Sequence, residues 1–459
     1  MPRCDPKVVV RAGALIERTS SNDVVTLATD RGPAPMNIAA VLVVDSALDL
    51  DFTTVSSALR DRLPRVRRLR QRLMKTPPGC GRPIWVDDPD FDLGRHLSRT
   101  ALTGAPDPVP DADRASVEQV LEIAATMVCT PLALDRPLWA ARWVSGLAGD
   151  RAALILVMHH ALTDGVGGLA VLAALGDDGP EVGADRVPQP PPRAMSLFAD
   201  AWRDRATALR KVPSRLRAGR DGLRELGLSP KRPPRLAART SLNRPTGHSR
   251  RLTVARVSLA PLLQQAHQRG CTLNDLVLVA VTGAMAGVLH RRGERPSELV
   301  VSVPISMRRT ATVDRLGNET GVVPLAIPTL ADQDARLERI TALSSARRGA
   351  PRGTSAGPMG LVFRALGALH LFQVFIDHQR FVHTFVTNVR GPESPVSFAR
   401  HRIVRVVPAA VSPGNVGVCF DVLSYAGELV VTVVADPDVL PEQDQLTSLL
   451  VEELQGLVT

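Results

Sequence analysis

The side chains best suited to catalysis are two adjacent histidines in the run 159–165, which reads HHALTDG. A neutral imidazole accepts a proton near pH 7, so one histidine suits a general base that activates a hydroxyl group for nucleophilic attack. Successive side chains at a strand end point to opposite sides, so we expect only one of His159 and His160 to be the base and the other to be structural. Asp164 can orient the turn or meet a cation, and Gly165 is expected to adopt a backbone angle that a side chain would forbid.

Other chemistries fit this run less well. A metal site would have only His159, His160 and Asp164 as ligands, because HExxH and HxxxH spacings and cysteine clusters are absent from the sequence. Adjacent ligands on a strand also diverge. We expect neither a metal site nor a serine-hydrolase site. A histidine pair without any catalytic role stays open as an alternative.

The elements around the histidines alternate between strand and helix patterns. The apolar run 37–44 predicts a strand, and a long basic helix is expected over 53–73. The run 152–158 predicts a strand that leads directly into His159, and a helix follows over 169–175. The motif therefore lies at a strand-to-helix turn. Beyond residue 250, the pattern predicts a strand over 252–259, helices over 261–268 and 273–290, and a strand over 298–303.

Length and composition predict two domains. A chain of 459 residues exceeds what one core usually organises, and its 44% hydrophobic and 22% charged residues are ordinary for a globular protein. We expect a first domain over 1–187, a Pro-rich basic crossover over 188–250 and a second domain over 251–459. The similar order of elements on the two sides of the crossover predicts a pseudo-dimer, although no sequence repeat is evident.

The crossover contains a predicted basic amphipathic helix. Phe198, Trp202 and Leu209 belong to one face, several arginines to the others, and Pro213 is expected to kink the helix. Two interpretations stay open. The helix is either a linker packed across both domains or a contact with a membrane surface.

The formal charge of +10 comes almost entirely from arginine, since lysine occurs only at 7, 75, 211 and 231. A basic surface favours anionic partners such as acidic lipids or a phosphorylated ligand. Nucleic acid is not expected, because an aromatic content of 3% leaves few platforms for base stacking. Five cysteines without a CxxC pair favour a reducing cytosol. With no export signal and no long uncharged apolar run, we expect a cytoplasmic protein whose membrane contact is peripheral.

HHALTDG resembles the HHxxxDG signature of the bacterial wax ester synthase/diacylglycerol acyltransferase family, a relative of nonribosomal condensation domains and chloramphenicol acetyltransferase. Other stretches resemble the family's motifs and run in the family's order. They are PMN at 35–37, WVDDPDFD at 85–92, DRPLW at 135–139, TLND at 272–275, PISMR at 304–308, GN at 317–318, TNVRGP at 387–392 and LSYAG at 423–427. The chain departs from the family pattern at 21–24, where its opening stretch is reduced, and at Ala140, where an acidic residue is frequent.

The resemblance implies an α/β (α+β) fold of two chloramphenicol-acetyltransferase-like domains, each a mixed β-sheet with helices, that meet at a tunnel. It implies an acyl-CoA-dependent O-acyltransferase of lipid metabolism, which makes triacylglycerol from diacylglycerol or wax ester from a long-chain alcohol. His160 would take the alcohol proton, and coenzyme A would leave without an acyl-enzyme intermediate. Acyl-CoA would be a substrate, and no cofactor is expected.

The resemblance also assigns roles around the histidines. Asp164 would be an architectural anchor that pairs with Arg308, with Arg309 as the second choice. Three further groups are weaker substrate-binding candidates, each with a structural alternative. Asn274 and Asp275 would cap a helix over 276–289, Asn388 would form a turn, and Pro137, Leu138 and Trp139 would form a packing corner.

Two other functions stay open. One is a catalytically idle lipid-binding or scaffold protein, which the intact histidines, Asp164 and Gly165 disfavour. The other is a condensation-type transferase with a carrier-protein donor, which the motifs after residue 250 disfavour. The expected partners are acyl-CoA, a lipid alcohol and a surface at the inner membrane face or a lipid droplet, together with a second copy of the chain.

Overall fold

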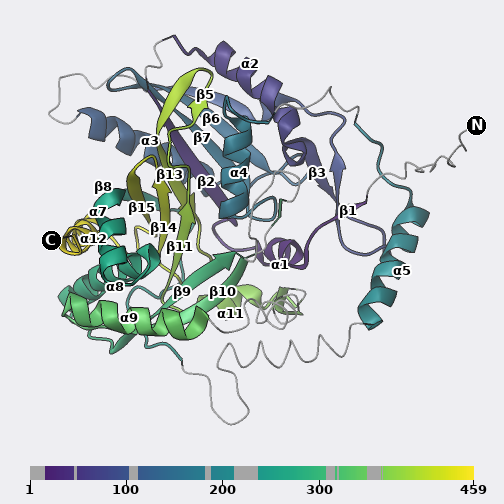
Figure 1. The fold of residues 1–459 in the computed structure, drawn as a ribbon. Helices are drawn as coiled ribbons and strands as arrows, with labels where there is room; N and C mark the ends of the chain where they lie inside the picture. Colours follow the sequence, from purple (N-terminus) through teal and green to yellow (C-terminus); the bar gives the residue numbers. More distant parts are fainter. Residues whose placement is uncertain are drawn as a thin grey trace, which may run out of the picture.

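Two six-stranded mixed sheets form the two halves of the protein, shown in Figure 1. The structure is a computed structural model that describes residues 16–45, 49–102, 112–180, 188–210, 236–306, 316–317, 320–348, 363, 365–367 and 369–458. The first sheet has the strand order β12-β13-β2-β7-β6-β5, and the second has the order β10-β9-β11-β14-β15-β8. A three-stranded sheet, β1-β4-β3, lies beside the first six-stranded sheet. This architecture confirms the expected fold class.

The first half contains the elements that surround the histidines. Its strands are β1 (Glu17–Arg18), β2 (Asn37–Val44), β3 (Gln71–Met74), β4 (Ile84–Asp87), β5 (Leu97–Ala101), β6 (Trp139–Leu147) and β7 (Arg151–His159). Its helices are α1 (Ser21–Thr29), α2 (Phe52–Arg62), α3 (Ala112–Val128), α4 (Gly165–Leu175) and α5 (Ala194–Arg210).

The second half repeats the same kinds of element. Its strands are β8 (Arg251–Ser258), β9 (Glu298–Ser306), β10 (Thr320–Pro328), β11 (Thr384–Arg390), β12 (Ser397–Phe398), β13 (His401–Ala410), β14 (Val418–Tyr425) and β15 (Glu428–Ala435). Its helices are α7 (Leu259–Gln268), α8 (Leu273–Arg291), α9 (Gln333–Arg348), α11 (Phe372–Asp377) and α12 (Gln443–Gly456).

Most sequence-predicted elements lie where they were expected, but the long helix predicted over 53–73 is wrong. The helix α2 ends at Arg62, two short 3-10 turns follow, and the chain becomes strand β3 at Gln71. Pro64 lies in the first of these turns and has no N–H to continue the helical hydrogen bonds. The predicted strand 37–44 is confirmed as β2.

The strand β13 crosses between the two halves. It belongs to the second half of the chain, yet it pairs antiparallel with β2, with Ala410 opposite Ile38 and Ile403 opposite Val44. The Tyr425 hydroxyl, at the end of β14, donates to the Ile403 carbonyl at 2.8 Å and accepts from the Val396 amide at 2.8 Å. The first sheet is therefore completed by chain from beyond residue 396. The predicted domain boundaries at 187 and 250 stay predictions.

The two halves also share a hydrophobic core. Val41 and Val157 from the first sheet are buried in one cluster with Leu252, Val430 and Val434 from the second sheet. The burial of this continuous apolar surface fixes the two sheets against each other.

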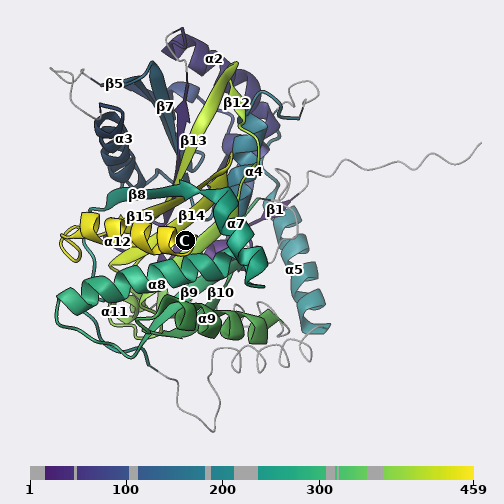
Figure 2. The ribbon, with the colours of Figure 1, turned by 60° about the vertical axis from the view of Figure 1, so that its left-hand side comes forward.

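The helix α8 is the one described helix that is long and apolar enough to cross a membrane. Its apolar stretch is 72% buried inside the protein, where it packs between α9 and α12 (Figure 2). A helix that is apolar on all faces is typical of a protein core as well as of a membrane span, and the packing here is that of a core helix.

Candidate active site

The two histidines lie where β7 ends, between β2 and β6. The backbone amide of His159 donates to the Leu138 carbonyl at 3.0 Å, and that of His160 donates to the Met36 carbonyl at 2.8 Å. Asn37 is the register partner of His159 across the β2–β7 pair. The PMN and DRPLW stretches thus hold the backbone of the histidine pair from its two sides.

His159 is buried and both of its ring nitrogens are occupied. Its Nδ1 accepts a hydrogen bond from the Ala161 amide at 3.0 Å, so the ring proton is on Nε2. Nε2 donates to Oδ2 of Asp30 at 2.9 Å. The other carboxylate oxygen of Asp30 accepts from the Met36 amide at 2.8 Å. This network holds the His159 ring in one orientation.

His160 differs from His159 in its exposure and in its hydrogen bonding. Its side chain is partly exposed, and its Nδ1 is buried with no hydrogen bond to another described residue. Burial of the ring lowers the pKa of His160 below its ordinary value, whereas its own carbonyl and the Asp164 carboxylate favour the protonated form and act in the opposite direction. Because burial has the larger effect, the ring is held neutral.

Asp164 begins the helix that follows the histidines. It is buried at the N-cap of α4, and its Oδ1 accepts from the Gly167 amide at 2.9 Å. Its carbonyl accepts the Gly168 amide at 2.8 Å. Arg308, the expected partner of Asp164, and the second choice Arg309 lie outside the described residues.

The prediction for Gly165 is wrong in its reason. Gly165 is the first residue of α4 and has no positive φ. Space is what limits this position, because a Cβ there would lie 3.3 Å from Val389 Cγ2 of β11. A Cβ on Gly167 would lie only 2.2 Å from Thr163 Oγ1. The start of α4 is therefore closely packed on both halves of the protein.

Two weaker candidates for substrate binding, Asn274 and Asn388, lie close to each other in the second half. Asn388 Nδ2 and Asn274 Oδ1 are 3.4 Å apart, and Val389 follows Asn388. The expected capping role at the start of α8 is confirmed for Asp275 but is wrong for Asn274, because the helix begins at Leu273. Thr272 is the N-cap, and Asp275 is its capping-box partner, with Asp275 Oδ2 accepting from the Thr272 amide at 2.9 Å. Asn388 lies within β11, so it does not form a turn.

Leu138 and Trp139 are buried, and Pro137 precedes them in a packed corner. The Trp139 ring stacks on His96 with centroids 4.6 Å apart, and His96 stacks on Phe91 at 5.3 Å. Trp139 Nε1 donates to the Leu69 carbonyl at 2.7 Å. These contacts join the WVDDPDFD and DRPLW stretches and support the packing interpretation for this corner.

Two family models match the chain. The wax ester synthase/diacylglycerol acyltransferase catalytic domain matches residues 19–277, more than half of the sequence, and the corresponding C-terminal domain matches residues 316–457. The chain belongs to the wax ester synthase/diacylglycerol acyltransferase family. It is therefore an acyltransferase, and the idle-scaffold alternative is not favoured.

Individual relatives agree with the family assignment. The chain is 30% identical over 459 residues to a probable diacylglycerol O-acyltransferase of Mycobacterium tuberculosis. The alignment covers 96% of this chain and 92% of that protein. The solved wax ester synthase/diacylglycerol acyltransferase of Marinobacter aquaeolei VT8 has a TM-score of 0.66 at 19% identity and covers 96% of this chain and 98% of its own. A starter condensation domain of rhizomide synthetase, solved with C8-CoA, shares the fold with a TM-score of 0.59 at 15% identity. That match covers 96% of this chain and 94% of the condensation domain.

Two of the family stretches pair with each other in the second sheet. The strands β11 and β14, which carry TNVRGP and LSYAG, pair in parallel with Asn388 opposite Val422 and Arg390 opposite Ser424. The Gly391 amide donates to the Ser424 carbonyl at 2.8 Å, and a Cβ on Gly391 would lie 2.6 Å from that oxygen. Glycine is needed here for close backbone approach.

Sequence reasoning missed Asp30 and Asp23. Asp23 is in the capping box of α1 with Ser20, and its charge favours a proton on His160. The spacing of Ser20 and Asp23 is a capping signal that the sequence does carry. Asp30 follows the end of α1, and nothing in its local sequence indicates that it meets His159.

Several expectations have no test in the structure. Gly353–Gly357 does have G-x-S-x-G spacing, contrary to our expectation of no hydrolase-like site, but it lies outside the described residues. Two surface hollows formed by described residues, one along α2 and one beside α7 and α12, lie away from His160, so the tunnel stays a prediction. The described residues contain no cluster of three His, Cys, Asp or Glu side chains that would hold a metal.

Proposed function

We propose that the protein transfers a long-chain acyl group from acyl-CoA to a lipid alcohol, with His160 as the general base. The acceptor is diacylglycerol, a long-chain alcohol or both. The observation that carries the proposal is the contrast between the adjacent histidines. His159 has both ring nitrogens in hydrogen bonds, whereas the His160 ring makes none to another described residue.

The environment of His160 suits a base. Burial lowers its pKa, so the imidazole is neutral at physiological pH and its acceptor nitrogen is available. A proton on Nδ1, the ring nitrogen nearer the backbone, leaves Nε2 as the acceptor for the hydroxyl proton. A base placed in this way contributes on the order of 100- to 10,000-fold to the rate.

The reaction then needs no covalent intermediate on the protein. Nε2 of His160 takes the hydroxyl proton as the alcohol oxygen attacks the thioester carbonyl carbon. The tetrahedral intermediate collapses with cleavage of the carbon–sulfur bond, and His160 returns the proton to the leaving thiolate of coenzyme A. The ester and free coenzyme A are the products.

The other site residues position this base. His159 and Asp30 fix the end of β7, and Asp164 fixes the start of α4 on the opposite side of the turn. Asn274 and Asn388 are candidates for substrate contact from the second half, because their side-chain amides lie 3.4 Å apart where β11 meets the start of α8.

The substrate class draws support from the relatives. A relative of similar length is a probable diacylglycerol O-acyltransferase, and a condensation domain of the same fold was solved with C8-CoA. The phosphates of coenzyme A also suit a chain with a formal charge of +10 that comes mostly from arginine.

The proposal is tested with the purified full-length chain, palmitoyl-CoA, and either dipalmitoylglycerol or hexadecanol. Coenzyme A release is followed with a thiol reagent, and neutral lipid is followed by thin-layer chromatography. His160→Ala is expected to lose at least about 100-fold in rate. The control is His267→Ala, an exposed histidine on α7, which should keep full activity. Equal neutral lipid from His160→Ala and the wild type would exclude His160 as the base, and no product with either alcohol would exclude this acceptor class.

A further inference from the structure

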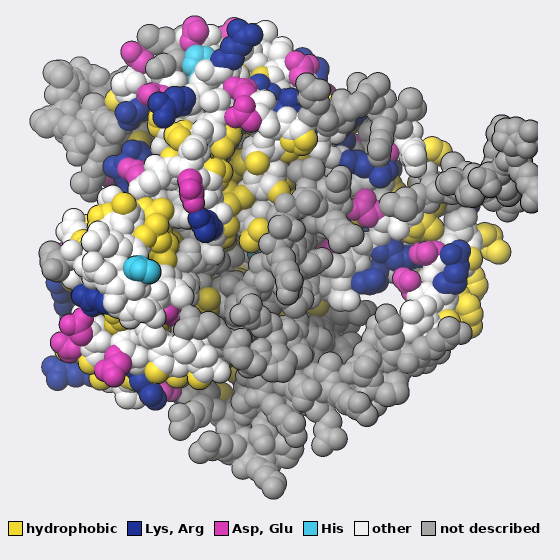
Figure 3. All heavy atoms as spheres, viewed as in Figure 1, with side chains coloured by type: hydrophobic (Ala, Val, Ile, Leu, Met, Phe, Trp, Pro, Cys, Tyr) yellow, Lys and Arg dark blue, Asp and Glu magenta, His cyan; other side chains and the backbone are white. Residues whose placement is uncertain are grey.

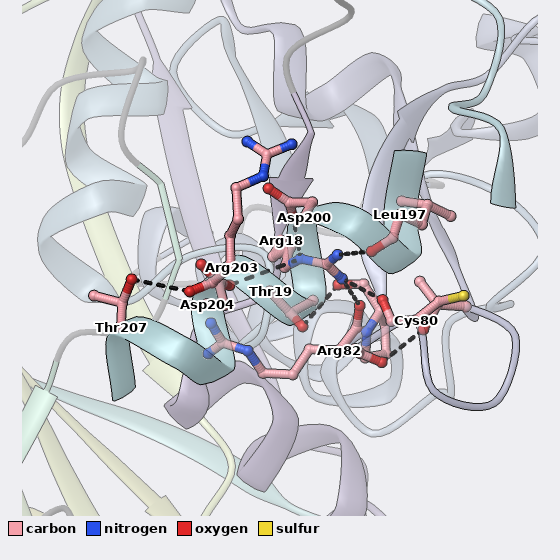
Figure 4. A network of polar contacts seen from close by, with 12 residues as sticks. Arg18, Thr19, Cys80, Arg82, Leu197, Asp200, Arg203, Asp204 and Thr207 are labelled. Carbon is pink, nitrogen blue, oxygen red and sulfur yellow. Dashed lines mark hydrogen bonds and ion pairs between the residues drawn. The ribbon is translucent and has the colours of Figure 1, made fainter. Parts of the chain in front are cut away.

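The helix α5 is clamped to the small sheet of the first half by one buried arginine. The Arg18 side chain of β1 is 7% exposed, and its Nε donates to Asp200 Oδ2 at 2.8 Å (Figure 4). Its Nη1 donates to the Cys80 and Arg82 carbonyls at 2.9 and 3.0 Å, and its Nη2 donates to the Leu197 carbonyl at 3.0 Å. This fan of charge-assisted bonds fixes which face of α5 points inward.

The inward face of α5 is narrow. Leu197 and Ala201 are buried in it, and Asp200 lies next to them on the same side. Asp204, one turn further, also approaches Arg18, at 4.0 Å. Asp200 therefore turns toward the protein, whereas the Asp204 side chain stays 62% exposed at the edge of this face.

The outward face of α5 is apolar. Met195 is 78% exposed, Phe198 46% and Trp202 62%. Their spacing of three and four residues places them on one side of the helix, and the rings of Phe198 and Trp202 stack with centroids 6.4 Å apart. We call these three residues the α5 stripe. Figure 3 shows hydrophobic side chains along the outer margin of this helix, beside both basic and acidic ones.

The exposure of Trp202 is unusual within this protein. The chain has four tryptophans, and Trp85, Trp139 and Trp143 are each no more than 3% exposed. Aromatic residues are only 3% of the sequence, so two exposed rings on one helix are a concentrated feature. An exposed apolar patch of this kind marks an interaction surface.

The charges beside the α5 stripe determine what it binds. Arg203 and Arg205 are exposed and lie on the two flanks of the stripe by helical spacing, while Asp200 and the more exposed Asp204 lie within 4.0 Å of Arg18. An apolar face with aromatic residues and flanking arginines is the pattern of a helix that lies in the interface of a lipid bilayer. The formal charge of +10 adds attraction to an acidic surface.

We propose that the α5 stripe docks the protein onto an anionic lipid bilayer. The side chains of Met195, Phe198 and Trp202 enter the boundary between headgroups and acyl chains, and Arg203 and Arg205 contact lipid phosphates. The inference rests on the proposed function in one respect, since a water-insoluble acceptor is reached from a membrane surface. It goes beyond that function by assigning the surface and the lipid charge.

The experiment is vesicle flotation with the full-length protein. Vesicles contain phosphatidylcholine with 30% phosphatidylglycerol, which gives a negative surface, or phosphatidylcholine alone. The wild type should float with the acidic vesicles, and much less with neutral vesicles or at high salt. Phe198→Ser with Trp202→Ser should reduce binding at least about tenfold, because two aromatic anchors are lost. The matched control is Leu263→Ser with Val374→Ser, which changes side chains of similar exposure, 48% and 60%, on other helices and should float like the wild type.

A second measurement follows Trp202 directly. Its fluorescence should shift to the blue when acidic vesicles are added, because the other three tryptophans are already buried. Folding of the double variant is checked by its circular dichroism and thermal midpoint, since exposed side chains contribute little to the core.

Three results would overturn the docking proposal. The first is a wild type that does not float with acidic vesicles. The second is a folded double variant that floats as well as the wild type. The third is a wild-type dimer, seen by light scattering, that the double variant no longer forms although its flotation is unchanged. The last result would assign the stripe to a second copy. Flotation requires no turnover, and His160→Ala should float normally, so failure of acyl transfer and failure of docking are separate outcomes.

Discussion

Asp30 fixes the tautomer of His159: Nε2 of the histidine donates to Oδ2 of the carboxylate at 2.9 Å, while Nδ1 accepts from the Ala161 amide. The same carboxylate holds the Met36 amide, and the Met36 carbonyl holds the amide of His160. A residue from the loop after α1 is thus linked through two hydrogen bonds to the backbone of the proposed base.

We predict that Asp30→Ala lowers kcat by about 10- to 100-fold with little change in KM, because a small misplacement of a base is costly. Asp30→Asn keeps an acceptor oxygen and should retain more activity. Steady-state kinetics with palmitoyl-CoA and dipalmitoylglycerol give both constants. A kcat of Asp30→Ala equal to that of the wild type would show that this link does not position His160.

The acid limb of the activity profile should lie below pH 6.5. The base must be neutral, and burial lowers the pKa of His160 from its ordinary 6.5. Activity is therefore lost only as pH falls through a value lower than this. The measurement is kcat/KM from pH 4.5 to 8 with a folding check at each pH. A midpoint above 6.5 would mean that the ring is stabilised as a cation, contrary to its burial.

Two glycines one residue apart should respond differently to alanine. A Cβ on Gly167 would lie 2.2 Å from Thr163 Oγ1, whereas a Cβ on Gly168 would meet Met158 Cε at an ordinary 3.6 Å. We expect Gly167→Ala to lower the free energy of unfolding by about 1–3 kcal/mol through overpacking. Gly168→Ala is the matched control and should be neutral or stabilising by up to about 1 kcal/mol. Urea denaturation of both variants tests this, and equal effects would contradict the packing at the start of α4.

A buried carboxyl in β14 should make stability depend on pH. Asp421 accepts hydrogen bonds from Thr387 Oγ1 of β11 at 2.7 Å and the Ala410 amide of β13 at 2.6 Å. Burial raises its pKa from 3.8 to about 6, and these bonds act in the opposite direction. Between these two pH values the folded state keeps a proton that the unfolded state has lost, so the free energy of unfolding falls as pH rises.

We predict that Asp421→Asn flattens this part of the stability profile, because an amide does not titrate. The thermal midpoint is measured at pH 4, 5, 6 and 7 for the wild type and the variant. The same slope in the two proteins would assign the pH dependence to other groups.

The local features of the site could be predicted from the sequence. The strand 37–44, the strand before the histidines and the turn at Asp164 all follow from patterns within a few residues. Features that depend on contacts between distant residues could not. Nothing near Asp30 indicates His159, and nothing near His401 indicates that its strand pairs with β2. The continuous helix predicted over 53–73 was an avoidable error, since Pro64 is a strong signal against a helix at that position. The sequence likewise favours Thr272 over Asn274 as the N-cap of α8, because Asp275 follows Thr272 at the capping-box spacing.

The crossing of β13 has a consequence for biosynthesis. More than 350 residues separate the end of β2 at Val44 from the start of β13 at His401. A ribosome takes roughly 20–70 s to make that length at ordinary elongation rates. For this interval the nascent chain carries β2 with one edge uncovered, which is a template for wrong pairing with other chains. We therefore expect the nascent chain to depend on chaperones until nearly all of it has been translated.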